Sequence, residues 1–305
     1  MRLPDFVHFC IVIEVRLSQL IPPLFRLLAR IPLPILHAWG GLLGWLVYLC
    51  SAAQRRRTRA NMALALGRSP KGHELRKNAQ ETGRMMFELP FVWLRPLDEV
   101  LAKVVRVEGW EKVEALRAAG RPMVALTPHL GCFEIISLYI GARMPMTVLY
   151  RPPKLTEAEA FLRAGRQRGQ IQLAPADLSG VRRLIKAMRQ GEATGLLPDQ
   201  APGKGEGVWV PFFGRPAYTM TLAARLSEVQ GAGVLLFWGE RIAGKGWCIH
   251  VEELQETLDG SIDARAATLN REVERIILKC PSQYLWSYNR YKVPAGVTSP
   301  VSSES

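Results

Sequence analysis

Short apolar runs alternate with helix-like segments from Val104 onward, and this alternation constrains the fold more than any other feature of the sequence. Strands separated by helices are typical of a sheet that is covered on both faces. We therefore predict an α/β fold with a mixed, mostly parallel sheet surrounded by helices. The expected strands are VVRV (104–107), MVAL (123–126), MTVLY (146–150), ATGLL (193–197), GVLLFW (233–238) and WCIHV (247–251). The expected helices lie near residues 73–92, 111–120, 181–192 and 264–278, and after residues 132 and 150.

An uncharged run from Ile31 to Ala53 precedes this region. As a helix it would reach about 35 Å, which is enough to cross a bilayer. Arg26 and Arg30 stand before the run and RRRTR (55–59) follows it directly. Its aromatic residues resemble those found at membrane interfaces, and they are Trp39, Trp45 and Tyr48.

Three interpretations of this run compete. A buried core helix would not usually be bracketed so tightly by arginines, and arginines straight after a cleavage site at Ser51–Ala53 are unusual for a signal peptide. We therefore expect a hydrophobic anchor helix that spans the bilayer or lies in its interface. The larger arginine cluster follows the run, which places the main body in the cytoplasm.

The net charge is +13, from 40 Lys and Arg against 27 Asp and Glu, so anionic partners are expected. Nucleic acid, anionic lipid and an acidic protein all qualify. No helix-turn-helix, zinc-finger or RNA-binding strand signature occurs, so we do not expect a nucleic-acid partner. The five cysteines lie far apart without a C-x-x-C pair, which predicts neither a disulfide framework nor a zinc site. They are Cys10, Cys50, Cys132, Cys248 and Cys280.

Two glycine-rich segments resemble phosphate-binding loops, but neither is expected to bind phosphate. The segment Gly239–Lys245 has the spacing of a P-loop, but Gly246 replaces the required Ser or Thr and a strand follows instead of a helix. A hairpin turn is the better interpretation. The segment Gly203–Gly207 lacks dinucleotide-binding spacing and is expected to be a loop.

The segment TPHLGCFE carries the strongest sign of catalysis. His129 follows the buried run MVAL, at the strand end where open α/β sheets form their ligand crevices. Glu134 falls in the first turn of the next helix, from which its carboxylate can reach the imidazole and leave the other ring nitrogen to take a proton from a hydroxyl. A nucleophilic pair of Cys132 with His129 is the rival interpretation.

Further polar residues follow other expected strands. Together they predict a basic, partly apolar crevice suited to an anionic lipid head group and an acyl chain. An apolar-aromatic loop, VPFFGRPAYTMT (210–221), is expected to contribute to it. The polar residues are Tyr150 and Arg151, Arg166 and Arg168, and Asp199 with Gln200.

Taken in order, these motifs resemble the bacterial lipid A biosynthesis (late) acyltransferase family, within the lysophospholipid acyltransferase superfamily. The resemblance covers roughly residues 24–292. Its usual ending W-x-H-R-R-F-K reads WSYNRYK (286–292) here, so no role of that histidine is carried over. The matching elements are the anchor with its basic flank and Asn61, HLGCFE (129–134), YRP (150–152), R-x-R (166–168), PDQ (198–200), VPFFG with Ala217 and Thr219, and QYLW (283–286).

The resemblance implies a glycerolipid acyltransferase-like fold and a specific reaction. A fatty acyl group would pass from an acyl carrier protein thioester to a hydroxyl of a phosphorylated lipid A precursor, at the cytoplasmic face of the inner membrane, with no metal or organic cofactor. His129 would be the general base and Glu134 would orient it. Residues implied in substrate binding are Arg151, Arg166, Arg168 and Asp199. The acidic carrier and anionic membrane lipids would both be partners of the basic chain.

Two other functions remain open at the level of sequence. One is an acyltransferase that acts on a glycerophospholipid or another glycolipid, and the other is a non-enzymatic scaffold that binds anionic lipid. We expect the anchor to occupy residues 1–54, with 1–23 as an extension, the catalytic domain residues 55–294, and a disordered tail residues 295–305.

Overall fold

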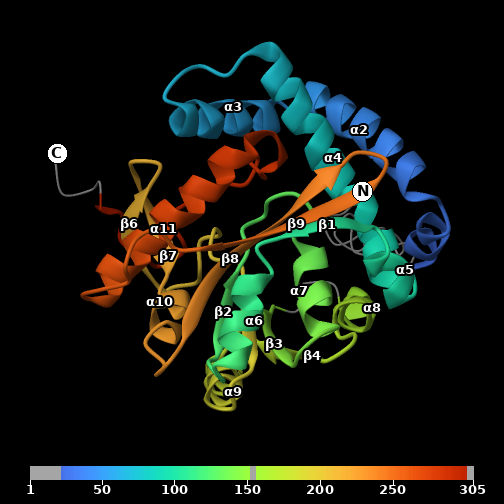
Figure 1. Cartoon of the computed structure of the whole chain (residues 1–305). Coiled ribbons are helices and arrows are strands. Elements are labelled where there is room, and N and C mark those ends of the chain that lie inside the picture. The colour runs from blue at the N-terminus through green and yellow to red at the C-terminus, as the bar shows by residue number, and fades with distance from the viewer. Residues whose placement is uncertain (1–21, 152–155, 301–305) are drawn as a thin grey trace, which may run out of the picture.

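The computed structural model describes residues 22–151 and 156–300, and a seven-stranded sheet runs through its centre (Figure 1). The strand order is β1-β9-β8-β2-β5-β3-β4, and every neighbouring pair is parallel except β8 with β9. The predicted mixed, mostly parallel sheet is therefore confirmed. The strands are β1 (Val104–Glu108), β2 (Met123–Leu126), β3 (Met146–Tyr150), β4 (Ile171–Pro175), β5 (Ala193–Leu196), β8 (Gly233–Ile242) and β9 (Gly246–Glu253).

Helices cover both faces of this sheet, each over its own apolar core. Alternate residues of one strand point to opposite faces, so Ala125 packs with the α7 side while Val124 packs with the α9 side. The helices of the first side are α6 (Glu111–Ala118), α7 (Glu134–Gly141) and α8 (Thr156–Arg166). Those of the second side are α9 (Leu178–Arg189), α10 (Leu222–Leu226) and α11 (Ile262–Lys279).

Two segments differ from the sequence-based prediction. Residues 210–221 are not a loop, because most of them belong to the antiparallel hairpin β6 (Gly207–Phe212) and β7 (Arg215–Met220). Pairing satisfies the backbone there, so Phe212 and Ala217 can be buried beside α11. The strand β4 was not predicted, since its sequence IQLAP is short and ends in proline.

The hairpin predicted at the P-loop-like segment is confirmed. Strands β8 and β9 pair in antiparallel register from Leu235 with Glu253 to Ile242 with Gly246. Gly244, with a φ of 76°, makes the turn between them, a backbone conformation that side-chain-bearing residues rarely adopt. The segment therefore makes a turn between strands, with no helix N-terminus to bind phosphate.

The uncharged run forms helix α2 (Leu33–Cys50). Helix α3 (Ala52–Leu66) follows directly, with Ser51 as its N-cap. Among the described residues, α2 is the one helix long and apolar enough to cross a membrane by length and composition. It packs lengthwise against α4 (Gly72–Leu94), which α5 (Leu97–Leu101) follows. The approach is so close that a Cβ built on Gly83 would lie 1.9 Å from the carbonyl oxygen of Gly40.

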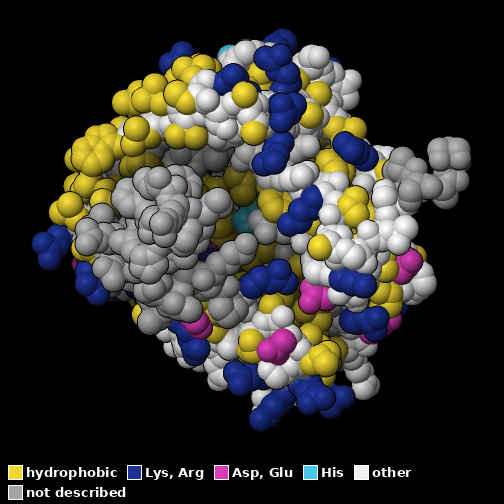
Figure 2. Space-filling view, turned by 180° about the vertical axis from the view of Figure 1, so that it is seen from behind, with side chains coloured by type: hydrophobic (Ala, Val, Ile, Leu, Met, Phe, Trp, Pro, Cys, Tyr) yellow, Lys and Arg dark blue, Asp and Glu magenta, His cyan; other side chains and the backbone are white. Residues whose placement is uncertain are grey.

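The opposite side of α2 carries exposed apolar side chains. Its large apolar side chains form a continuous group, visible as the hydrophobic region at the upper left of Figure 2. An exposed apolar patch of this extent marks a surface that contacts a membrane or a partner. This surface, called the α2 apolar face below, consists of Ile35, Trp39, Leu42, Leu43, Leu46, Val47 and Leu49.

A buried network of charges connects α2 and α4 to the β8–β9 hairpin. Arg241 of β8 is fully buried and donates to Glu88, with Nε to Oε2 at 2.8 Å, and to Glu81 at 2.9 Å. His37 of α2 accepts the Gly244 N–H on Nδ1 at 3.0 Å, so its Nε2 is the atom that donates to Glu88, also at 3.0 Å. Burial alone would raise the pKa of Glu88, but Arg241 and His37 lower it to about 2.

The predicted boundaries of the anchor and tail stay predictions. The expected extension, residues 1–23, falls almost entirely outside the described residues, as does the end of the tail after residue 300. Within the described part of the tail, the carbonyl of Thr298 accepts a hydrogen bond of 2.9 Å from the indole N–H of Trp209.

Candidate active site

A cavity of about 870 Å³ opens at the carboxyl ends of strands β2, β3, β4 and β5. Figure 2 shows this face of the molecule hollowed near its centre, with a histidine side chain visible in the hollow. The cavity walls are mostly apolar, as in sites that bind a hydrophobic ligand with a polar end. The polar groups of the lining include His129, Glu134, Arg151, Arg166, Gln200 and Arg225. Its apolar part includes Ile136, Met146, Val148, Ile171 and Leu173.

His129 lies at this cavity and is held by Asp199, whereas Glu134 had been expected to hold it. His129 follows β2 and Asp199 follows the neighbouring parallel strand β5, so their loops meet at the same sheet edge. Oδ1 of Asp199 lies 2.9 Å from the imidazole Nδ1, and Oδ2 accepts the His129 main-chain N–H at 2.9 Å. The expected hydrogen bond between His129 and Glu134 is therefore wrong, because both ring nitrogens have other partners.

The remaining ring nitrogen of His129 is a hydrogen-bond acceptor. Since Nδ1 donates to the carboxylate of Asp199, the lone pair of the neutral ring lies on Nε2. The side-chain amide of Gln200 donates to it at 3.1 Å. The ring of Phe133 packs beside the imidazole with 4.7 Å between ring centroids. The arrangement presents a basic nitrogen to the cavity in a fixed orientation.

Asp199 stays ionised at the floor of the site. The carboxyl is buried, which alone would raise its pKa, but electrostatic attraction and hydrogen bonds from His129, together with the hydrogen bond from the Tyr284 hydroxyl, hold that pKa below its ordinary value. The same environment raises the pKa of the Tyr284 hydroxyl well above its usual range, so this group remains a donor. Tyr284 belongs to the QYLW segment, whose part in the site was not inferred from the sequence.

Glu134 pairs with Arg166. Nε of Arg166 lies 3.1 Å from each carboxylate oxygen, and Nη2 donates to Oε1. Burial opposes the guanidinium charge, but Glu134 outweighs that effect and raises the pKa of Arg166. The guanidinium also faces the rings of Trp93 and Tyr150. Arg166 is therefore a fixed cation in the cavity wall.

Arg168 does not join Arg166, although both arginines were implied in substrate binding. Its Nη1 donates to the carbonyl of Val92 at 2.9 Å and its Nη2 to that of Arg95 at 2.5 Å. These carbonyls lie at the end of α4, so Arg168 caps that helix. Arg151 does line the cavity, where its largely exposed side chain faces Glu206 at 3.5 Å.

Tyr150 places an unused donor in the cavity wall. Its hydroxyl is buried and, within the described residues, has no hydrogen-bond partner. Burial raises the pKa of this hydroxyl, so it stays protonated. A buried polar group without a partner costs free energy, and an oxygen of a bound ligand would satisfy it.

Cys132 is not a nucleophile in this geometry. The thiol is buried against the charged network, and burial together with Glu88 raises its pKa well above the usual value. Because the thiolate is the reactive form, a thiol kept protonated cannot act as the attacking group. Cys132 is also absent from the cavity lining, so neither its protonation nor its position supports the competing Cys132–His129 interpretation.

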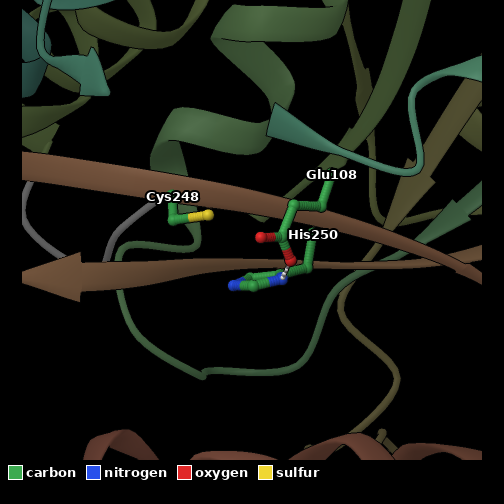
Figure 3. A group of neighbouring side chains, drawn as sticks. All are labelled: Glu108, Cys248 and His250. Carbon is green, nitrogen blue, oxygen red and sulfur yellow. Dashed lines mark ion pairs between the residues drawn. The ribbon is translucent and has the colours of Figure 1, made fainter. Parts of the chain in front are cut away.

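A second group of potential ligand atoms lies at the β1 edge of the sheet (Figure 3). Glu108, Cys248 and His250 place one such atom each within 4.8 Å of one another, a proximity that their distance in the sequence concealed. Two carboxylates already hold His250, since Glu108 contacts Nδ1 at 2.9 Å and Glu240 contacts Nε2 at 3.0 Å. The Nε of Arg106 donates to the Cys248 sulfur at 3.4 Å, and a guanidinium there repels a metal cation. We assign the group to an ion-pair cluster that ties β1 to β9.

Comparison with known proteins gives a consistent family signal over most of the chain. The family model described as bacterial lipid A biosynthesis acyltransferase matches residues 18–293. The chain is 28% identical to the lipid A biosynthesis lauroyltransferase of Escherichia coli K12 over 90% of each chain. It is 26% identical to the palmitoleoyltransferase of the same organism, over 88% of this chain and 89% of that protein. A lipid A biosynthesis acyltransferase of Haemophilus influenzae is 26% identical over 98% of this chain and 97% of its own length.

Proposed function

The chain belongs to the bacterial lipid A biosynthesis acyltransferase family and is an O-acyltransferase of lipid A precursors; from this premise we propose how its residues carry out the transfer. The acyl donor is the thioester of an acyl carrier protein, and the acceptor is a hydroxyl of a phosphorylated lipid A precursor. The observation that carries the proposal is the His129–Asp199 pair beside a largely apolar cavity.

His129 acts as the general base. Its Nε2 removes the proton of the acceptor hydroxyl while that oxygen attacks the thioester carbonyl carbon. This attack forms the new carbon–oxygen bond. Collapse of the tetrahedral intermediate then restores the carbonyl and breaks the carbon–sulfur bond, and the proton on Nε2 passes to the leaving thiolate. The amide of Gln200 occupies Nε2 in this structure at 3.1 Å, so it yields that position to the acceptor hydroxyl.

Asp199 takes the orienting role first assigned to Glu134. It holds the tautomer in which Nε2 is basic and stabilises the imidazolium that forms in the reaction. Glu134 acts one step away, because it fixes the guanidinium of Arg166 in the cavity wall. Within the described residues, Nη1 of Arg166 makes no hydrogen bond, so this nitrogen can bind an acceptor phosphate or the developing oxyanion.

The cavity has an apolar part for the fatty acyl chain and a charged part for the phosphorylated acceptor. Ile136, Met146 and Ile171 belong to the apolar part, which suits the fatty acyl chain. Arg151 is an exposed cation of the lining and suits the phosphorylated acceptor.

We propose that the α2 apolar face contacts the inner membrane and that the body of the enzyme lies on the cytoplasmic side. One side of α2 packs on α4 and carries His37 into the charged network, so the exposed opposite side is the one that can meet lipid. A helix held in this way lies in the interface, parallel to the membrane surface, with the basic residues of α3 beside the anionic head groups.

Mass spectrometry of a reconstituted reaction tests this function. Purified protein, an acyl carrier thioester and an under-acylated lipid A precursor should give a product heavier by one acyl group. His129→Ala should lower the rate by about 10²–10⁴-fold without unfolding the protein. Equal rates for the variant and the wild type would contradict the assignment of the base.

A further inference from the structure

Helix α9 carries a row of cations on its solvent side. Arg182, Lys186 and Arg189 are exposed, and within the described residues none of them forms an ion pair. Because successive residues of a helix turn by about 100°, these three lie within one narrow sector of the helix surface. Leu178 stands in the same sector and is 78% exposed, more than any other large apolar side chain described. These four residues are called the α9 stripe.

The stripe starts at the cavity. Leu178 and Val181 contribute to the cavity lining, and so does the exposed Arg225 of α10. The first turn of α9 is rigid, since Asp177 accepts the main-chain N–H groups of Ser179 at 2.8 Å and Gly180 at 3.0 Å. From Leu178 the stripe runs away from the opening for about 16 Å, at 1.5 Å per residue.

The stripe and the α2 apolar face lie at opposite ends of the molecule. Figure 1 shows α9 at the lower end and α2 with α3 at the upper end. With the α2 apolar face on a membrane, the stripe points away from the bilayer into the aqueous phase. Its charges therefore suit a soluble acidic partner, and anionic head groups would be out of reach.

We propose that the α9 stripe is the docking surface for the acidic carrier protein that delivers the acyl thioester. The inference rests on the proposed function. Acidic side chains of the carrier pair with Arg182, Lys186 and Arg189, while Leu178 inserts into an apolar contact at the end nearest the cavity. The thioester arm then enters past Val181 and Arg225, which brings the reacting carbonyl to the side of His129. Donor and acceptor reach the site from opposite directions.

Charge reversal on the stripe provides the test. In Arg182→Glu/Lys186→Glu, kcat/KM for an acyl carrier thioester should fall by about 10-fold or more, mainly through KM, because like charges then face the carrier. Transfer from an acyl pantetheine thioester, which has the same reacting group without the protein, should be unchanged. The wild-type KM for the carrier should rise with ionic strength, and that dependence should be weaker in the variant.

Arg117→Glu/Arg143→Glu is the control for the change in net charge. Both residues are exposed on the opposite face of the sheet, on α6 and just after α7, and their reversal changes the net charge by the same amount. This variant should keep the wild-type KM for the carrier. Melting temperatures of all variants should be measured to establish that each is folded.

Three results would overturn the proposal. The first is an unchanged KM for the carrier in a folded stripe variant, and the second is an equal loss with acyl pantetheine. The third is a loss of binding to phosphatidylglycerol vesicles with normal carrier kinetics, which would make the stripe a membrane contact. Failure of the wild-type protein to use any carrier thioester is a different result, since it removes the proposed donor itself.

Discussion

Asp199 holds His129 through both carboxylate oxygens, with Oδ1 2.9 Å from the imidazole Nδ1 and Oδ2 2.9 Å from the main-chain nitrogen of the same residue. The two contacts fix the ring and the loop that carries it. A neutral His129 held in this way has its proton on Nδ1 and its basic lone pair on the cavity side.

Asp199→Asn should therefore lower acyl transfer by about 10²–10⁴-fold in kcat. The asparagine oxygen can still accept the His129 main-chain N–H, so the fold should survive while the imidazole loses its orientation. Reaction rates measured by mass spectrometry check the loss of activity, and melting temperatures check that the fold is kept. An active Asp199→Asn protein would show that the pair is structural only.

Glu134→Ala should also lower the rate, by about 10²–10³-fold, through the loss of a fixed Arg166. If the two act as one unit, Arg166→Ala and the double variant Glu134→Ala/Arg166→Ala should be no more impaired than Glu134→Ala alone. Additive losses in this double-mutant cycle would mean that Glu134 contributes to catalysis independently of Arg166.

Arg168 should prove structural. Arg168→Ala leaves the carbonyls of Val92 and Arg95 without their donor, which should lower the free energy of unfolding by about 1–3 kcal/mol. The KM for the phosphorylated acceptor should stay at its wild-type value in the fraction that remains folded. A raised acceptor KM in Arg168→Lys at normal stability would instead support the phosphate contact first expected from the sequence.

Glu88 should make the free energy of unfolding depend on pH in the acidic range. Its pKa is lowered from 4.5 to about 2 in the folded protein, so it binds protons more weakly there than in the unfolded chain. The corresponding stabilisation, about 3 kcal/mol, is fully present above the unfolded pKa and is lost as the pH falls toward the folded one. Glu88→Gln should be less stable at neutral pH, and its deficit in chemical denaturation should shrink as the pH is lowered below 4.5. A deficit that does not change with pH would exclude this linkage.

The membrane contact can be tested without deleting α2. Removing residues 1–54 would also take His37 from Glu88, so aggregation is the expected result of that truncation. Leu42→Asp/Leu46→Asp instead places two charges on the α2 apolar face, and should move the protein from the membrane to the soluble fraction. Leu278→Asp on α11, a similarly exposed leucine, is the control and should remain membrane-bound.

Local sequence determined most of the secondary structure. The runs at 104–107, 123–126 and 146–150 form strands with almost the same bounds as predicted. Each run is too short for a helix and is mostly apolar, which favours a strand. The β6–β7 hairpin was missed, since the apolar residues around Phe213 gave no signal for the pairing that buries them. The charged network was also missed, because Glu88 and Arg241 are 153 residues apart.

For the site, the sequence by itself placed His129, Arg166 and Asp199 at strand or helix ends around one crevice, since parallel strands bring their carboxyl ends to one edge. Only the tertiary structure decided which acid meets which base. The close spacing of Glu134 to His129 favoured that pair, yet strand pairing of β2 with β5 carries Asp199 to the imidazole, and α8 brings Arg166 to Glu134. Spacing along a chain limits what a side chain can reach, but the neighbours it meets depend on how distant strands are ordered in the sheet, and that order follows from the packing of the whole core.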